Sequence, residues 1–109
     1  MIYELRTYTA TPGMMDRLHA RFRDHTRRIF ARHGIQSVGY WVQSAPDDGA
    51  GDLVYLVTHP SAEAAVENWQ AFRADPEWIA AKAESERDGP IVANITSRFL
   101  EPTDYSALQ

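Results

Sequence analysis

The sequence contains no cysteine, and this absence excludes several kinds of chemistry at once. Without thiols the chain cannot form disulfides, bind a metal through thiolates or use a cysteine nucleophile. Long apolar runs are also missing, because no stretch approaches the roughly 20 residues needed to span a bilayer. No charged leader followed by an apolar segment precedes the first expected strand, so we expect no signal peptide, no membrane partner and a cytoplasmic location.

Positive charge is in short supply, because 11 lysine and arginine residues are set against 15 acidic residues, which gives a formal charge of −4. A nucleic-acid surface is normally basic, so nucleic acid is not an expected partner. The chain has no glycine-rich phosphate loop, nucleotide fingerprint or Gly-x-Ser-x-Gly elbow. Its histidines do not have the spacing of an established metal motif, so neither a metal nor a cofactor is expected.

The composition that remains is that of an ordinary globular domain, with 44% hydrophobic and 24% charged residues. A chain of 109 residues can bury a hydrophobic core but is too short for two domains. We therefore expect residues 1–109 to form one domain.

The apolar residues follow strand and helix periods in turn, which predicts the order βαββαβ. Leu18, Phe22, His25 and Ile29 lie at the spacing of one helical face, and Gly34 follows where a left-handed residue often ends a helix. We expect strands at 2–9, 35–43, 53–59 and 91–100, a helix over 14–33, a second beginning at the N-cap Ser61, and a restart at Asp75 and Pro76 that continues to about residue 87.

This order is the ferredoxin-like pattern of the α+β class, a four-stranded antiparallel sheet with helices on one face and the first strand between the third and fourth. We assign Tyr8, Trp41, Tyr55 and Val57 to the face without helices, which would then be too apolar to stay in water. A second copy of the chain is the simplest cover. The prediction is a homodimer whose two facing sheets form an α/β barrel.

The first strand is unusually polar for a strand in the middle of a sheet. Side chains alternate across a strand, so Glu4, Arg6 and Tyr8 share one face and Leu5 takes the other, which we assign to the helices. The last strand offers a matching polar set, Asn94, Thr96 and Arg98, which we expect beside Glu4, Arg6 and Tyr8, with Glu4 meeting Arg98. The polar row would then line the barrel interior.

Two interpretations of the polar row stay open. Its groups either satisfy one another, with or without trapped water, or they form a pocket in which Arg6 or Arg98 holds an anionic or carbonyl group while Glu4 or a histidine moves a proton. His25 is either a core histidine or, if it reaches the cavity, the best general base. The candidate catalytic residues are Glu4, Arg6 and His25, and the candidate substrate-binding residues are Tyr8, Trp41, Tyr55, His59, Asn94 and Arg98.

Six short segments spread over the chain carry a resemblance to a known family. They are IYELRTY at 2–8, PG at 12–13, HG at 33–34, VGYW at 38–41, DPEW at 75–78 and FLEPTDYS at 99–106. Together they resemble the NIPSNAP family. The resemblance implies the dimeric α/β barrel of a ferredoxin-like superfamily that also contains antibiotic-biosynthesis monooxygenases and haem-degrading enzymes. Many members carry a Trp and an aromatic residue late in the third strand, where this chain has Val57 and His59.

Two hypotheses of function follow. The first is a homodimer that binds a small planar or anionic metabolite between sheet and helices, with any catalysis being cofactor-free proton transfer or oxygenation by Glu4, Arg6, Tyr8 and His25. The alternative is a non-enzymatic interaction or scaffold module whose barrel is filled by side chains and which binds partners through the 44–52 loop or the C-terminal tail. A third hypothesis is a haem-binding relative, although the Asn, Trp and His constellation of haem degraders is not found.

Overall fold

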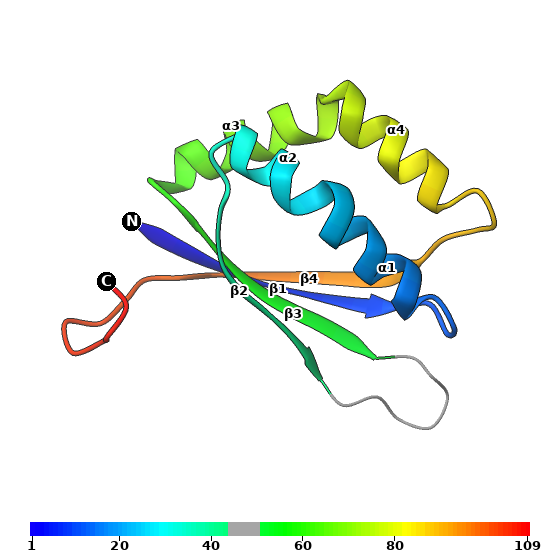
Figure 1. Ribbon diagram of the computed structural model, residues 1–109. Coiled ribbons are helices and arrows are strands. Elements are labelled where there is room, and N and C mark those ends of the chain that lie inside the picture. Colours follow the sequence, from blue (N-terminus) through cyan, green and yellow to red (C-terminus); the bar gives the residue numbers. More distant parts are fainter. Residues whose placement is uncertain (44–50) are drawn as a thin grey trace.

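The computed structural model describes residues 1–43 and 51–109. The strands form one antiparallel sheet in the order β2-β3-β1-β4, with the helices on one face (Figure 1), so the predicted ferredoxin-like α+β fold is confirmed. Within the described residues the sheet ends at β2 and β4 and is not closed into a barrel. The elements in chain order are β1 (Ile2–Ala10), α1 (Met15–Arg21), the π-helical turn η1 (Phe22–Thr26), α2 (Arg27–Arg32), β2 (Gln36–Gln43), β3 (Asp52–His59), α3 (Ala62–Ala74), α4 (Pro76–Ser85) and β4 (Val92–Leu100).

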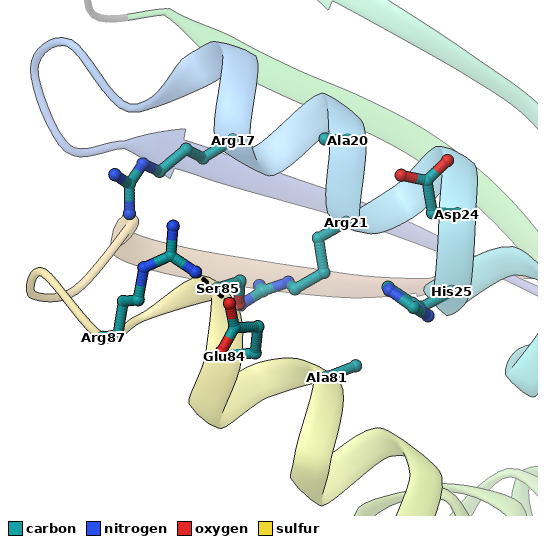
Figure 2. A pocket seen from close by; sticks show the side chains of 9 residues that line it. All are labelled: Arg17, Ala20, Arg21, Asp24, His25, Ala81, Glu84, Ser85 and Arg87. Carbon is teal, nitrogen blue, oxygen red and sulfur yellow. Dashed lines mark hydrogen bonds and ion pairs between the residues drawn. The ribbon is translucent and has the colours of Figure 1, made fainter.

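The first helix is continuous from α1 through η1 to α2, and η1 is a wide π turn. The Thr26 hydroxyl donates to the Arg21 carbonyl oxygen at 3.2 Å, five residues back along the chain. After this turn Thr26 is fully buried, whereas His25 is only partly buried and lines a cavity beside α4 (Figure 2). The regular stripe that we expected to aim His25 at the sheet is therefore interrupted by the π turn.

The helix ends follow the capping residues of the sequence. The Ser61 hydroxyl accepts from the Ala64 amide at 3.1 Å, and the Asp75 carboxylate accepts from the Glu77 amide at 2.8 Å, with Pro76 as the first residue of α4. Gly34 follows α2 with a φ of 75°, in the left-handed region that glycine occupies without strain. These local predictions are confirmed.

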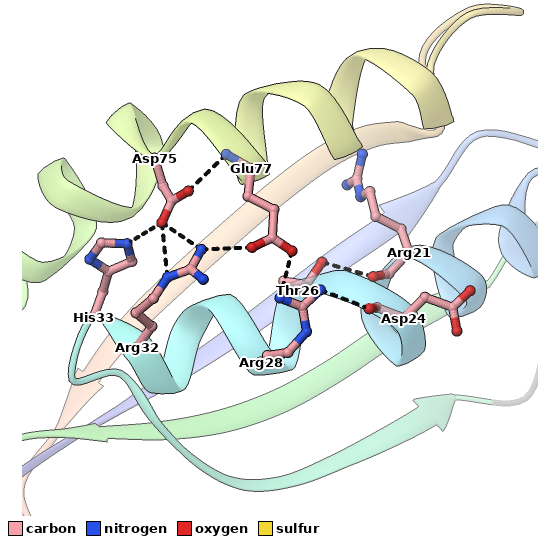
Figure 3. Close-up of polar contacts among 8 residues, drawn as sticks. All are labelled: Arg21, Asp24, Thr26, Arg28, Arg32, His33, Asp75 and Glu77. Atoms are coloured by element: carbon pink, nitrogen blue, oxygen red, sulfur yellow. Dashed lines mark hydrogen bonds and ion pairs between the residues drawn. The ribbon is translucent and has the colours of Figure 1, made fainter.

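Asp75 also ties the end of α2 to the junction between α3 and α4 (Figure 3). Its Oδ2 atom accepts from His33 Nε2 at 2.6 Å and from Arg32 Nη2 at 2.8 Å. The bond from His33 is the main cause that lowers the pKa of Asp75. Glu77 extends the contact by pairing with both Arg28 and Arg32. Residues 28–33 and 75–77 thus form one ion-pair cluster that holds α2 against the junction between α3 and α4.

The register of β1 contradicts our assignment of its faces. Glu4 lies opposite Val57 and Phe99, and Arg6 lies opposite Tyr55 and Ser97. These side chains meet α3, because Glu4 accepts a hydrogen bond from the Trp69 indole. Glu4, Arg6 and Tyr8 therefore face the helices, and the prediction that they point away from them is wrong. Leu5 lies on the uncovered face, opposite Leu56 and Arg98.

The hydrophobic core lies between the sheet and the helices, and it is largely aromatic. Phe30 is at its centre, with ring centroids 4.9 Å from Phe72, 5.3 Å from Trp69 and 6.0 Å from Tyr55. Tyr40 stacks on Tyr55 at 5.1 Å. Tyr8, Tyr55 and Val57 are buried in this layer, so our assignment of these three to the uncovered face is wrong as well.

The uncovered face is still apolar, although with other residues than we assigned. Trp41 is 55% exposed there, and Leu5 and Leu56 contribute further apolar surface. The C-terminal tail folds back over one end of this face, where the Tyr3 hydroxyl donates to the Gln109 carbonyl at 3.0 Å and both termini lie at the same end of the molecule (Figure 1). Among the described residues, no helix is both long and apolar enough to cross a membrane.

Candidate functional site

Glu4 is the centre of a buried polar cluster under α3. The side chain is 2% exposed, and both carboxylate oxygens accept two hydrogen bonds. Oε1 accepts from Trp69 Nε1 and His59 Nε2, each at 2.8 Å. Oε2 accepts from Arg6 Nη1 at 2.9 Å and from the Ser97 hydroxyl at 2.5 Å. Four donors from β1, β3, α3 and β4 therefore converge on one carboxylate.

These donors keep Glu4 ionised. Burial alone would raise its pKa, but the hydrogen bonds from His59, Ser97, Trp69 and Arg6 outweigh it and lower the pKa to about 2. An ionised carboxylate whose oxygens are all occupied has little capacity to accept a proton near neutral pH. The arrangement favours Glu4 as an anchor for its neighbours over the proton-transfer role expected from the sequence.

Arg6 is held on several sides and still reaches solvent, with 14% of its side chain exposed. Nε donates to the Tyr55 hydroxyl at 2.8 Å, and Nη2 makes a longer contact of 3.4 Å with the Tyr8 hydroxyl. The guanidinium lies 4.2 Å from the Trp69 ring centroid, at cation–π distance. Burial opposes its charge, but Tyr55, Tyr8 and Glu4 together raise its pKa. Arg6 is thus a fixed and permanent cation.

Two residues of this cluster, Arg6 and Tyr8, keep donors available for a ligand. A guanidinium has five N–H groups, and one on each Nη atom of Arg6 has no acceptor among the described residues. Burial raises the pKa of Tyr55, which therefore keeps its proton and donates it to the Tyr8 oxygen at 3.1 Å. Because the Tyr8 oxygen accepts from both Tyr55 and Arg6, its own hydroxyl proton is free to donate elsewhere.

Arg6, Tyr8 and Trp69 form the floor of a cleft of about 500 Å³ between the sheet and the two C-terminal helices. Its walls are mainly apolar, and its charged residues besides Arg6 are Arg73, Lys82 and Glu86, of which the last two pair at 3.1 Å. A second cavity of about 410 Å³ adjoins the cleft and shares Tyr8 and Lys82 with it. The apolar wall residues are Phe72, Trp78, Ile79, Ala83 and Ile95.

Five of the nine predicted site residues lie together in this region, and four do not. Trp41 lies on the uncovered face, as does Arg98, which is opposite Leu5, so the predicted contact of Glu4 with Arg98 is wrong. Asn94 is opposite Thr9 on that same face, and it lines only the adjoining cavity. His25 lines the separate cavity shown in Figure 2. The residues that the structure brings together are Glu4, Arg6, Tyr8, Tyr55 and His59.

His59 lies behind Glu4 and does not line the cleft. Its Nε2 atom carries the proton donated to the ionised Glu4, and its buried Nδ1 atom has no hydrogen-bond partner in the described part of the chain. His59 and Glu4 carry atom types that could bind a metal, and no metal is expected from the sequence. Within the described ranges, no group of three or more His, Cys, Asp or Glu side chains is placed to hold a metal ion.

Sequence reasoning missed Trp69, Ser97 and the wall residues of α4. The indole N–H of Trp69 needs an acceptor when it is buried, and Glu4 supplies it. Ser97 alternates with Ile95 and Phe99 along β4. Assigning that more apolar set to the helix side would have placed Ser97 beside Arg6.

Comparison with known proteins establishes where this fold belongs. Residues 3–107 match the family model described as NIPSNAP, and no match was found among curated proteins. The structure is similar to that of a NIPSNAP family protein of unknown function from Agrobacterium tumefaciens, with a TM-score of 0.82 and 23% identity over 100% of this chain and 94% of that one. An uncharacterized NIPSNAP domain protein from Burkholderia xenovorans gives a TM-score of 0.79 and 21% identity over 97% and 98% of the two chains.

A more distant likeness links the fold to enzymes. An antibiotic biosynthesis monooxygenase gives a TM-score of 0.59 and 12% identity over 94% of this chain and 99% of that one. At these identities the solved structures show a shared fold and not a shared activity. The family model, in contrast, covers nearly the whole chain, and the protein therefore belongs to the NIPSNAP family.

Proposed function

We propose that the cleft binds a small planar anion, such as an aromatic carboxylate or an enolate, with its charged oxygen atoms at Arg6 and Tyr8. The observation that carries this proposal is the pair of unused donors at the floor of an aromatic cleft, the N–H groups of Arg6 and the hydroxyl of Tyr8. Hydrogen bonds from a guanidinium to an anion are among the strongest in proteins. Trp69 and Trp78 supply flat apolar surface for the planar part of the ligand.

The other residues of the cluster prepare these two donors. Glu4 fixes Arg6 and Trp69 at the same time, and Tyr55 orients the Tyr8 hydroxyl so that its proton is free. A donor that is already held in place loses little freedom when the ligand arrives, which improves affinity. Arg73 and Lys82 in the cleft add positive potential that draws an anion toward it.

An enzymatic role would extend this binding to cofactor-free proton transfer. A ligand that loses a proton next to a carbonyl group develops negative charge on oxygen, and there Arg6 and Tyr8 would donate more strongly than in the ground state. The proton passes to water or to the Glu86 carboxylate, which lines the same cleft. In an oxygenation, dioxygen would take two electrons from the resulting carbanion and form a carbon–oxygen bond, and the peroxide anion would take back the proton held by water or Glu86 to give a hydroperoxide. The distant monooxygenase-like fold supports this extension only as an analogy.

We further propose that a second copy of the chain covers the uncovered face of the sheet and forms a two-fold homodimer. This proposal is supported by apolar side chains that remain accessible in one chain, with Trp41 and Leu100 among the large exposed ones. The cleft lies on the opposite side of the sheet, so it would stay open in such a dimer. A cytoplasmic location stays a prediction.

The scaffold hypothesis expects an interior filled by side chains and partner binding through the 44–52 loop or the tail. A cleft of about 500 Å³ with unused donors supports the binding hypothesis instead. Residues 44–50 lie outside the described part of the chain, so the loop adds nothing to this comparison.

An NMR titration of the protein with benzoate tests the proposal. We expect saturable shifts of signals lining the cleft, and affinity about tenfold lower in Arg6→Lys, which keeps the charge but loses the planar fork. Tyr8→Phe should weaken binding several-fold, and benzamide, which lacks the charge, should bind less well than benzoate. Arg98→Ala is the matched control, because it removes a cation from the other face of the same sheet. Equal binding by wild type, Arg6→Lys and Tyr8→Phe would contradict the proposal.

A further inference from the structure

The cleft of about 500 Å³ and the adjoining cavity of about 410 Å³ are two parts of one groove. Their linings have five residues in common, which are Tyr8, Trp78, Lys82, Glu86 and Ile95. Ligand pockets in proteins commonly have volumes of about 300–1,000 Å³ and bury most of the surface of a drug-sized ligand. An anion as small as benzoate, bound at Arg6, would therefore leave most of this groove empty.

The groove is elongated, and it follows β4 away from Arg6. In the register of the sheet Arg6 lies opposite Ser97, and Tyr8 lies opposite Ile95. Ala93 comes two residues before Ile95, on the same face of β4, and lines the far part of the groove. A strand rises about 3.3 Å per residue, so the distance along β4 from Ser97 to Ala93 is about 13 Å. The donors of Arg6 therefore lie at one end of the groove.

Two large apolar side chains that line the groove are open to solvent. Ile79 on α4 is 54% exposed, and Ile95 on β4 is 47% exposed. The charged residues of α4 in the same lining are Lys82 and Glu86, which pair with one another at 3.1 Å, so neither is left as an isolated charge. Exposed apolar surface inside a groove favours a ligand with an apolar group, because covering that surface removes it from water.

We propose that the ligand of this site is an acid with an apolar arm, whose planar anionic head lies at Arg6 and Tyr8 and whose arm extends between Ile79 and Ile95 toward Ala93. This inference rests on the proposed function, from which it takes the anionic head, and it adds the arm. Charge complementarity sets the orientation, because the cation of Arg6 lies at one end of the groove. The length of the arm then determines which acids the protein binds most tightly.

A series of 4-alkylbenzoates tests the arm, with each compound titrated into the protein and followed by NMR. We expect the affinity to rise about twofold to fourfold with each methylene group from benzoate to 4-butylbenzoate, because each added group covers apolar surface of the groove. The amide 4-butylbenzamide carries the arm without the charge and should bind less tightly than 4-butylbenzoate. Equal affinities for benzoate and 4-butylbenzoate would overturn the inference.

Two variants decide whether the arm lies in the groove. Ala93→Phe fills the far part of the groove, and Ile79→Ser removes one apolar wall; both positions are at least half-exposed or on the surface, so the fold should tolerate the changes. In each variant the ratio of the affinities for 4-butylbenzoate and benzoate should fall by about fivefold or more. Val66→Ser is the matched control, since it removes another exposed aliphatic side chain from α3, outside the groove, and should leave the ratio unchanged. A ratio that is undiminished in Ala93→Phe would overturn the inference.

The same titrations separate this inference from the proposed function. If benzoate and its 4-alkyl derivatives bind with equal affinity and all bind more weakly to Arg6→Lys, the anion site is supported and the arm is refuted. If 4-butylbenzoate binds equally well to wild type and Arg6→Lys, its head does not lie at Arg6, and both proposals are contradicted. Affinity that rises along the series and depends on both Arg6 and Ala93 supports the two proposals together.

Discussion

The two faces of β1 differ in a way that reverses the usual expectation. Glu4 and Arg6 are charged, yet they face the core under the helices, whereas Leu5 is apolar and lies on the uncovered face. Glu4 can be buried because Arg6, His59, Ser97 and Trp69 donate to it. A charged side chain can therefore face the interior of a central strand when all its hydrogen bonds are made there.

The largest effect is expected from breaking the cluster at its centre. Glu4→Gln removes the charge that compensates Arg6 and replaces one acceptor oxygen by a donor, so the free energy of unfolding should fall by about 3–5 kcal/mol. Urea denaturation measures this change. Glu67→Gln, at an exposed position on α3, is the matched control and should shift stability by less than about 0.5 kcal/mol. A small loss for Glu4→Gln would mean that the helix-side face does not depend on this carboxylate.

Lowering the pH should reduce the stability that Glu4 contributes on the helix-side face of β1. Since folding lowers the pKa of Glu4 from 4.5 to about 2, its contribution to stability is complete above pH 4.5 and is lost as the pH falls toward 2. The contribution amounts to about 3 kcal/mol by linkage. The pKa of Asp75 is also lowered, so this residue adds to the loss of stability in acid. The quantity to measure is therefore the difference in the free energy of unfolding between wild type and Glu4→Gln across this pH range. A difference that does not shrink on acidification would show that the pKa of Glu4 is not lowered in the folded protein.

Smaller effects are expected at two neighbouring positions of β4 that lie on opposite faces of the sheet. Ser97→Ala removes one of the four donors to Glu4 and should cost about 1–2 kcal/mol in thermal or urea unfolding. Thr96→Ala changes the adjacent residue, which lies opposite Thr7 on the uncovered face. That variant should change stability by less than about 0.5 kcal/mol, and equal losses at the two positions would remove the distinction between the faces.

A substitution on the uncovered face should change the oligomeric state of the protein and leave its folding stability nearly unchanged. Trp41→Ser removes the large exposed aromatic side chain from the proposed dimer surface, so the equilibrium between dimer and monomer should shift toward the monomer. Light scattering coupled to size-exclusion chromatography measures the mass. Stability of the monomer should change by about 0.5 kcal/mol or less. A monomeric wild type would contradict the proposed dimer.

The order of the elements could be predicted because each element carries its own local signals. Ser61, Asp75 and Pro76 mark helix starts by capping chemistry that depends on neighbouring residues only, and Gly34 marks an end. The alternation in β1 correctly separated Glu4, Arg6 and Tyr8 from Leu5. It could not say which set lies under the helices, because strand alternation is symmetric.

The site could be predicted only in part, since it depends on contacts between distant residues. Trp69 and Ser97 meet Glu4 from 65 and 93 positions away in the sequence, and no local pattern announces such partners. The π turn that redirects His25 has no sequence signal of its own. Placing polar residues on the open face is a sound default, and it failed because the Glu4 carboxylate is fully satisfied inside the protein.

Indole N–H signals of the tryptophans test directly whether the ligand binds on the helix-side face of β1. The Trp69 indole donates to Glu4 and its ring lines the cleft, whereas the exposed Trp41 is on the opposite face. During benzoate titration the Trp69 N–H should be protected from hydrogen exchange and its signal should shift with the ligand, whereas the Trp41 N–H signal should not move. A benzoate-dependent shift at Trp41 together with an unprotected, unresponsive Trp69 would show that the ligand binds on the opposite face of the sheet.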